Sequence, residues 1–109
     1  PMTRTHDPRQ NRLLAALPAT EWARLQPRLE LTAMPLGHVL YESGMPLQHV
    51  YFPTNCIVSL LYVMEDGHSA EIAIVGKEGM VGVALFMGGE TTPSRAIVQS
   101  GGHACRGRP

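Results

Sequence analysis

The stretch that decides the fold class is Gly37-His38-Val39-Leu40-Tyr41-Glu42-Ser43-Gly44-Met45-Pro46. Residues 39–42 alternate with the period of a β-strand, and a glycine stands on either side of them as a turn residue. Similar short runs lie before and after this stretch, separated by turns rich in Gly, Pro and Asn. The pattern is typical of a protein built from many short antiparallel strands.

The other predicted strands surround this one. We expect them at residues 29–33, 49–52, 57–64, 70–74 and 95–99. The run Ile57–Met64 is nearly all apolar, as expected for a strand covered on both faces. Glu65-Asp66-Gly67 reads as the hairpin turn after it. The glycine-punctuated residues 75–82 suit a turn that leads into one helical turn at 82–87.

Residues 11–29 read as two short helices placed before the strands. Pro18 ends the first helix, and Thr20 is a plausible N-cap for the second. We expect Trp22 to pack against the sheet rather than to bind a ligand. Helices followed by strands in this order predict a mainly β fold, an antiparallel β-roll or jelly-roll with an N-terminal helical cap.

Composition limits the classes of function. The 109 residues suggest one domain, and nine Lys+Arg balance nine Asp+Glu, so DNA binding by these residues is not expected. No run approaches the roughly 20 apolar residues of a membrane helix, and the polar N-terminus has no signal-peptide pattern. We therefore expect a cytoplasmic protein without membrane contact. Reduced thiols at Cys56 and Cys105 fit that compartment better than a disulfide, which stays open.

Catalytic and metal-binding motifs are weak. No serine sits in a GxSxG elbow, and no glycine-rich patch has the order of a P-loop. The histidines are scattered without HxH or HxxxH spacing. We expect no enzyme activity, no metal and no cofactor. The alternative is a small cupin-like metal-dependent enzyme with its metal among His38, His49 and His68.

Four segments together resemble the sensor domain of the Crp/Fnr family of transcription regulators. They are Asn11–Pro18, Gly37–Pro46, Val50–Pro53 with Val58–Leu61 and the Asp66-Gly67 turn, and Gly79–Gly82 through Pro93–Val98. Their order and spacing make the resemblance specific. It implies a cyclic-nucleotide-binding-like β-roll over residues 11–104, with its closing strands missing or altered after Gln99. Residues 1–10 are then a disordered tail, and 105–109 a second tail.

The resemblance also implies partners. Members of this family sense a small effector, dimerise through a long helix and bind DNA through a C-terminal helix-turn-helix. Neither that helix nor the helix-turn-helix has a counterpart in these residues, so DNA and a homodimer are expected only for the intact regulator. The family's oxygen sensors carry an N-terminal cysteine group for an iron–sulfur cluster. Nothing like that group precedes Cys56.

The resemblance places the phosphate-binding cassette of the family in the fourth segment. The candidate effector-binding residues are Gly79, Gly82, Val83, Thr92, Ser94 and Arg95. In the family's cyclic-nucleotide binders, a glutamate directly after the turn glycine holds the ribose hydroxyl. An arginine two residues before a small residue on the next strand holds the phosphate.

This chain departs from both positions. Val83 follows the turn glycine, and Ser94 stands two residues before Ala96. Arg95 is displaced by one residue, which on a strand turns its side chain to the opposite face. We therefore expect a degenerate cassette that does not bind cyclic AMP in the usual way, with an unidentified effector or none.

Overall fold

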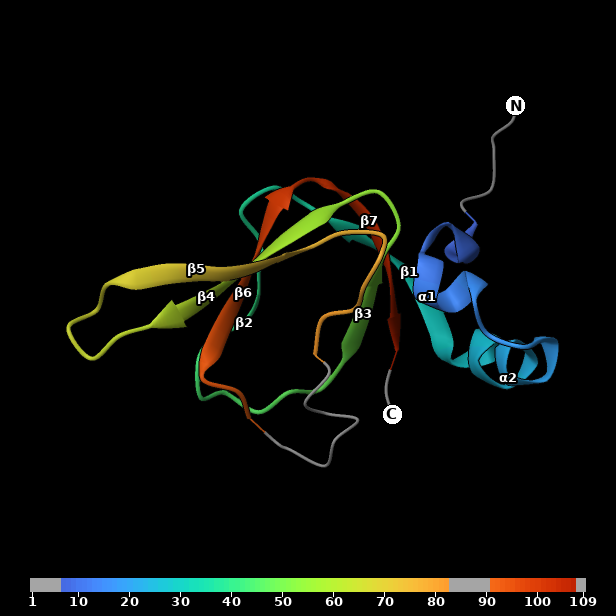
Figure 1. Cartoon of the computed structure of the whole chain (residues 1–109), viewed down its shortest axis with the longest axis horizontal. Helices are drawn as coiled ribbons and strands as arrows, with labels where there is room; N and C mark the ends of the chain where they lie inside the picture. Colours follow the sequence, from blue (N-terminus) through green and yellow to red (C-terminus); the bar gives the residue numbers. More distant parts are fainter. Residues whose placement is uncertain (1–6, 83–90, 108–109) are drawn as a thin grey trace.

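In the computed structural model, which describes residues 7–82 and 91–107, short helices precede a series of β-strands (Figure 1). The helices are η1 (Pro8–Gln10), α1 (Arg12–Ala15), α2 (Ala19–Leu25) and η2 (Gln26–Arg28). The strands are β1 (Leu29–Met34), β2 (Val39–Tyr41), β3 (Val50–Pro53), β4 (Ile57–Val63), β5 (Ser69–Val75), β6 (Ser94–Ser100) and β7 (Gly102–Gly107).

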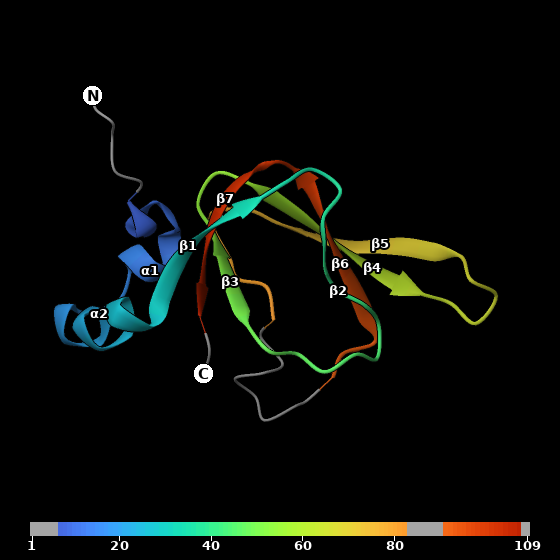
Figure 2. The same ribbon diagram turned by 180° about the vertical axis from the view of Figure 1, so that it is seen from behind.

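The strands form two antiparallel sheets. One sheet has the order β1-β7-β3 and the other the order β2-β6-β4-β5. Figures 1 and 2 show the two sheets curling around a common interior, with the helices beside the β1-β7-β3 sheet. The prediction of a mainly β, antiparallel roll with short N-terminal helices is confirmed.

Strand alternation sorts the side chains into an inner core and a helix-facing core. The inner core holds Met34, Tyr51, Cys56, Val58, Val81, Ala96, Val98 and Ala104. The helix-facing core holds Leu14, Val50, Phe52 and Cys105, with Trp22 packed against it. Strand β3 contributes to both because neighbouring residues of a strand point to opposite faces. The packing role expected for Trp22 is thus observed.

The helical cap begins earlier than the sequence predicted. Asp7 caps η1 by accepting a hydrogen bond from the Arg9 amide at 2.9 Å, so residues 8–10 are not a disordered tail; residues 1–6 lie outside the described part. The N-cap of α2 is Pro18 and not Thr20, which lies inside the helix. Pro18 is extended, and its carbonyl accepts from the Trp22 amide at 2.9 Å. No helix in the described ranges is long and apolar enough to cross a bilayer.

Strand β7 corrects the prediction for the end of the roll. The sequence placed residues 105–109 in a tail and expected the closing strands to be missing or altered after Gln99. Residues 102–107 instead form the central strand of the three-stranded sheet, with β1 on one side and β3 on the other. The segment forms a strand because both neighbours satisfy its backbone donors and acceptors, which its own residue pattern does not reveal.

Strand β4 is hydrogen-bonded on both edges but is not covered on both faces, so that expectation is wrong. The β4–β5 hairpin projects away from the helices in Figures 1 and 2. Tyr62 on β4 is 45% exposed, and Ile72 and Ile74 on β5 are more than half exposed. Gly67 closes the hairpin turn at φ +91° with its amide on the Met64 carbonyl. The helical turn expected at 82–87 falls almost wholly outside the described residues.

Candidate functional site

The candidate residues occupy two segments on either side of residues 83–90. Gly79 and Gly82 lie in the segment that follows β5, and Thr92, Ser94 and Arg95 lie at and just before the start of β6. Val83 lies outside the described residues. The backbones of the two segments are held by different parts of the roll.

The first segment is held against β3. Val81 and Tyr51 form an isolated antiparallel bridge, with N–O distances of 2.8 and 2.9 Å in the two directions. Gly82 follows with φ +93°, and a Cβ at this position would lie 2.8 Å from the carbonyl oxygen of His49. Both the backbone conformation and the close approach require glycine here. The sequence named Gly82 as a candidate effector-binding residue, and in the structure its backbone closely approaches His49, the residue before β3.

The helical cap holds the same segment through Asn11. This side chain is fully buried. Its Nδ2 donates to the carbonyl oxygens of Pro53 and Gly79, both at 2.8 Å, and its Oδ1 accepts from the amides of Leu13 and Leu14 at 3.0 and 3.2 Å. Asn11 thus caps α1 and joins it to the end of β3 and to Gly79. Sequence reasoning assigned Asn11 only to the first helix, although asparagine before a helix is a common N-cap.

The second segment places hydroxyl groups on the inner face of the roll. Ser94 is 6% exposed and shares the inner face of β6 with the core residues Ala96 and Val98. Arg95, between Ser94 and Ala96, points to the outer face. The hydroxyls of Thr92 and Ser94 are 3.1 Å apart, and the phenol of Tyr41 lies beside Ser94. Burial raises the pKa of Tyr41, and the neighbouring Ser94 side chain opposes that shift. The phenol is therefore neutral at neutral pH, and this face carries polar but uncharged groups.

Arg95 lies on the other face of β6. Its Nε is 2.9 Å from Oε1 of Glu42, which follows the end of β2. The same Nε is buried and has no aligned hydrogen-bond acceptor, so the contact with Glu42 is an ion pair. Arg95 therefore faces a carboxylate outside the core rather than the hydroxyl groups of Ser94 and Thr92.

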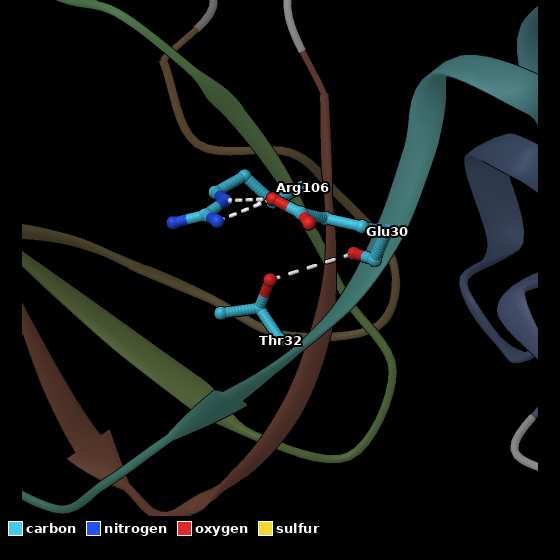
Figure 3. A network of polar contacts seen from close by, with 3 residues as sticks. All are labelled: Glu30, Thr32 and Arg106. Atoms are coloured by element: carbon cyan, nitrogen blue, oxygen red, sulfur yellow. Dashed lines mark hydrogen bonds and ion pairs between the residues drawn. The ribbon is translucent and has the colours of Figure 1, made fainter.

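A second cluster of polar side chains lies on the β1-β7-β3 sheet. Arg106 on β7 donates through Nε and a terminal nitrogen to Oε1 of Glu30, and the Thr32 hydroxyl lies 3.5 Å from the Glu30 carbonyl (Figure 3). The bond with Glu30 raises the pKa of Arg106, while burial raises that of Tyr51, which Arg106 also contacts. Sequence reasoning missed this group because it placed Arg106 in a tail.

Three remaining features bear on chemistry. A cavity of about 80 Å³ lies beside Tyr41 and Tyr51. Among the described residues, no group of three or more His, Cys, Asp or Glu side chains could hold a metal ion.

Cys56 and Cys105 are free thiols, and burial raises the pKa of both, to about 11 for Cys56. A buried thiol of raised pKa is a poor nucleophile at neutral pH.

Solved structures share this fold. The N-terminal domain of a transcriptional regulator from Streptomyces coelicolor A3(2) is similar at TM-score 0.76 and 22% identity, over 93% of this chain and 72% of that one. A regulatory subunit of a cAMP-independent protein kinase A from Trypanosoma cruzi, bound to guanosine, is similar at TM-score 0.77 and 14% identity, over 86% and 34%. The Thermus thermophilus catabolite activator protein is similar at TM-score 0.73 and 15% identity, over 88% and 45%.

The chain thus spans less than half the length of the last two structures. A search of curated proteins found no match. Among protein families, the one described as cyclic nucleotide-binding domain matches residues 32–106, from within β1 to within β7. This match covers most of the chain and both sheets of the roll. The chain belongs to the cyclic nucleotide-binding domain family.

Proposed function

We propose that the chain is the effector-sensing domain of a Crp/Fnr-type transcription regulator whose cassette does not bind cyclic AMP through the usual charged contacts. The observation that carries this proposal is the placement of two neighbours on β6. Ser94 is buried on the inner face with other hydroxyl groups, whereas Arg95 is paired with Glu42 on the opposite face.

The cyclic phosphate of cyclic AMP carries a negative charge. Contacts to charged groups contribute roughly 1.5–3 kcal/mol each. Without an arginine on the inner face and a glutamate after Gly82, about 3–6 kcal/mol of binding free energy is missing. That deficit corresponds to a loss of roughly two to four powers of ten in affinity. A phosphate moved into the roll without a counter-charge also loses part of its hydration.

Two of the similar structures support a regulatory role. One is part of a transcriptional regulator, and another is a cAMP-independent kinase subunit bound to guanosine. We infer by analogy that this chain senses a small effector and has no catalytic activity. In the intact protein, dimerisation and DNA binding would then belong to parts outside these residues, in the cytoplasm of a bacterial cell.

The cupin-like enzyme has no observation in its favour. A metal site at His38, His49 and His68 would bring imidazole nitrogens together. The described residues show no such group, and His68 instead lies 3.0 Å from Asp66 in the exposed hairpin turn. Stoichiometric zinc, iron or manganese in the purified protein would reopen this alternative.

Titration calorimetry with cyclic AMP and cyclic GMP tests the proposal. We expect no binding in the micromolar range for the wild-type chain, and no change in Arg95→Ala. Arg24→Ala is the matched control, because Arg24 also faces a carboxylate, that of Glu21 at 4.0 Å, but on α2. Micromolar binding that is lost in Arg95→Ala and retained in Arg24→Ala would contradict the proposal and make Arg95 the phosphate ligand.

A further inference from the structure

We propose that a cavity at the start of β1 and the end of β7 binds a small organic anion that carries one carboxylate. The cavity has a volume of about 630 Å³, which is within the range of small-molecule sites. Its charged and titratable lining side chains are Arg28, Glu30, His49 and Arg106. None of the described candidate residues of the cassette lines it, so this site goes beyond the proposed function.

Arg106 supplies hydrogen-bond donors that are already oriented. Its Nε donates to Oε1 of Glu30 at 2.9 Å, and one terminal nitrogen donates to the same oxygen. Figure 3 shows the other terminal nitrogen pointing away from Glu30. A guanidinium has five N–H donors, so Arg106 keeps donors for a second acceptor while the ion pair holds its side chain in place. That side chain is 32% exposed, which leaves it within reach of a ligand.

Arg28 adds a positive charge that no described carboxylate neutralises. It is the last residue of η2, it is exposed, and it forms no ion pair with another described residue. Two arginines and one glutamate give the cavity wall a net charge of +1 when His49 is neutral. A guanidinium matches a planar carboxylate with two parallel hydrogen bonds. The wall therefore suits one carboxylate better than a phosphate monoester, which carries nearly two negative charges.

The rest of the wall can hold the body of such a ligand. Pro27 and Leu29 also line the cavity, and Leu29 is kept in place by packing against the helix-facing core. The ring of His49 lies against that of Tyr51, with centroids 6.2 Å apart and planes tilted by 54°. These surfaces can contact an apolar or aromatic group while its carboxylate faces the arginines. Benzoate, an aromatic monocarboxylate, is therefore a suitable probe.

Calorimetry of the whole chain with benzoate, benzyl alcohol and phenyl phosphate tests the inference. We expect benzoate to bind in the millimolar range or more tightly, ahead of the other two compounds, and to lose affinity as the salt concentration rises. Arg28→Gln and Arg106→Gln should each weaken benzoate binding about three- to tenfold, because each removes one charged contact at a partly exposed site. Arg12→Gln is the matched control, because it removes an exposed arginine of α1 outside the cavity and should change nothing.

The outcomes separate the site from the ligand class. Benzoate binding that is weakened in Arg28→Gln and retained in Arg12→Gln supports the inference, and it does so even if thermal melts show that Arg106→Gln is unfolded. No benzoate binding at millimolar concentration, or equal binding by wild type, Arg12→Gln and folded Arg28→Gln, overturns it. Equal weakening in Arg28→Gln and Arg12→Gln also overturns it, because the effect is then one of overall charge.

Two further results would overturn the ligand class. Phenyl phosphate bound more tightly than benzoate argues against a single carboxylate, and benzyl alcohol bound as tightly as benzoate argues against a charged ligand. Binding of cyclic AMP bears on the proposed function alone, so the inference and the proposed function can fail separately.

Discussion

Replacing Asn11 tests how the helical cap is joined to the roll. Asn11 is buried and makes four hydrogen bonds through its side chain. Two of them cap α1, and the other two satisfy the carbonyl oxygens of Pro53 and Gly79, which are 42 and 68 residues away in the sequence. Asn11→Ala removes all four, whereas Asn11→Ser keeps a capping oxygen and removes the two amide donations.

The magnitude follows from the two kinds of bond. Losing an N-cap costs about 0.5–2 kcal/mol. Leaving a buried carbonyl without its donor costs about 1–3 kcal/mol, with the lower end expected for the partly exposed Gly79. We therefore expect Asn11→Ala to lose about 3–6 kcal/mol of unfolding free energy, and Asn11→Ser, which keeps the cap, to lose about 2–4 kcal/mol. For a small domain with roughly 5–15 kcal/mol in total, this is a large fraction.

Urea unfolding followed by circular dichroism measures these losses, and constant m-values would show that only stability has changed. Asn55→Ala is the matched control. Its side chain accepts from the His103 amide at 2.6 Å but is exposed, so its loss should stay below about 1 kcal/mol. Equal losses in Asn11→Ala and Asn55→Ala, or an Asn11→Ala chain as stable as wild type, would refute the reasoning.

Two further predictions concern backbone and pH. Gly82→Ala should lose more unfolding free energy than Gly67→Ala, because both glycines have φ near +90° but only Gly82 would bring a Cβ to 2.8 Å from the His49 carbonyl; equal losses would argue against that contact. Burial raises the pKa of Cys56 from 9.0 to about 11, so the stability gained from the protonated thiol is present below pH 9 and lost as the pH rises to 11. Urea unfolding in reductant should show a smaller loss over this pH range for Cys56→Ala than for wild type, and parallel curves would contradict the assignment.

Much of the fold could be predicted from the sequence because its strands carry local signals. Strands β2 and β4 are recognisable from alternation or apolar runs bounded by turn residues. Strand β7 could not be predicted in this way, because its position depends on pairing with distant strands. Arg106, for example, pairs with Glu30 on β1 and with Tyr51 on β3. Such long-range pairing is not encoded in neighbouring residues. The prediction of Thr20 as the N-cap of α2 was also wrong, because Pro18 and Thr20 are both acceptable near a helix start.

The candidate site shows the same division. Strand alternation was enough to predict that Ser94 and Arg95 face opposite ways, which is the arrangement observed. The partners of these residues could not be predicted, because Tyr41 and Glu42 come from a distant strand and the residue after it. Whether Gly79, Gly82, Thr92 and Ser94 contact an effector stays a prediction.

The most direct test of the central claim is to exchange Ser94 and Arg95. The double variant Ser94→Arg/Arg95→Ser keeps composition and net charge and moves the guanidinium from the outer to the inner face of β6. Cyclic AMP affinity is then measured by calorimetry for both chains, with thermal melts to confirm folding. We predict that the exchanged chain binds cyclic AMP at least tenfold more tightly than wild type, as one charged contact of roughly 1.5–3 kcal/mol implies. Equal affinity in the two folded chains would contradict it.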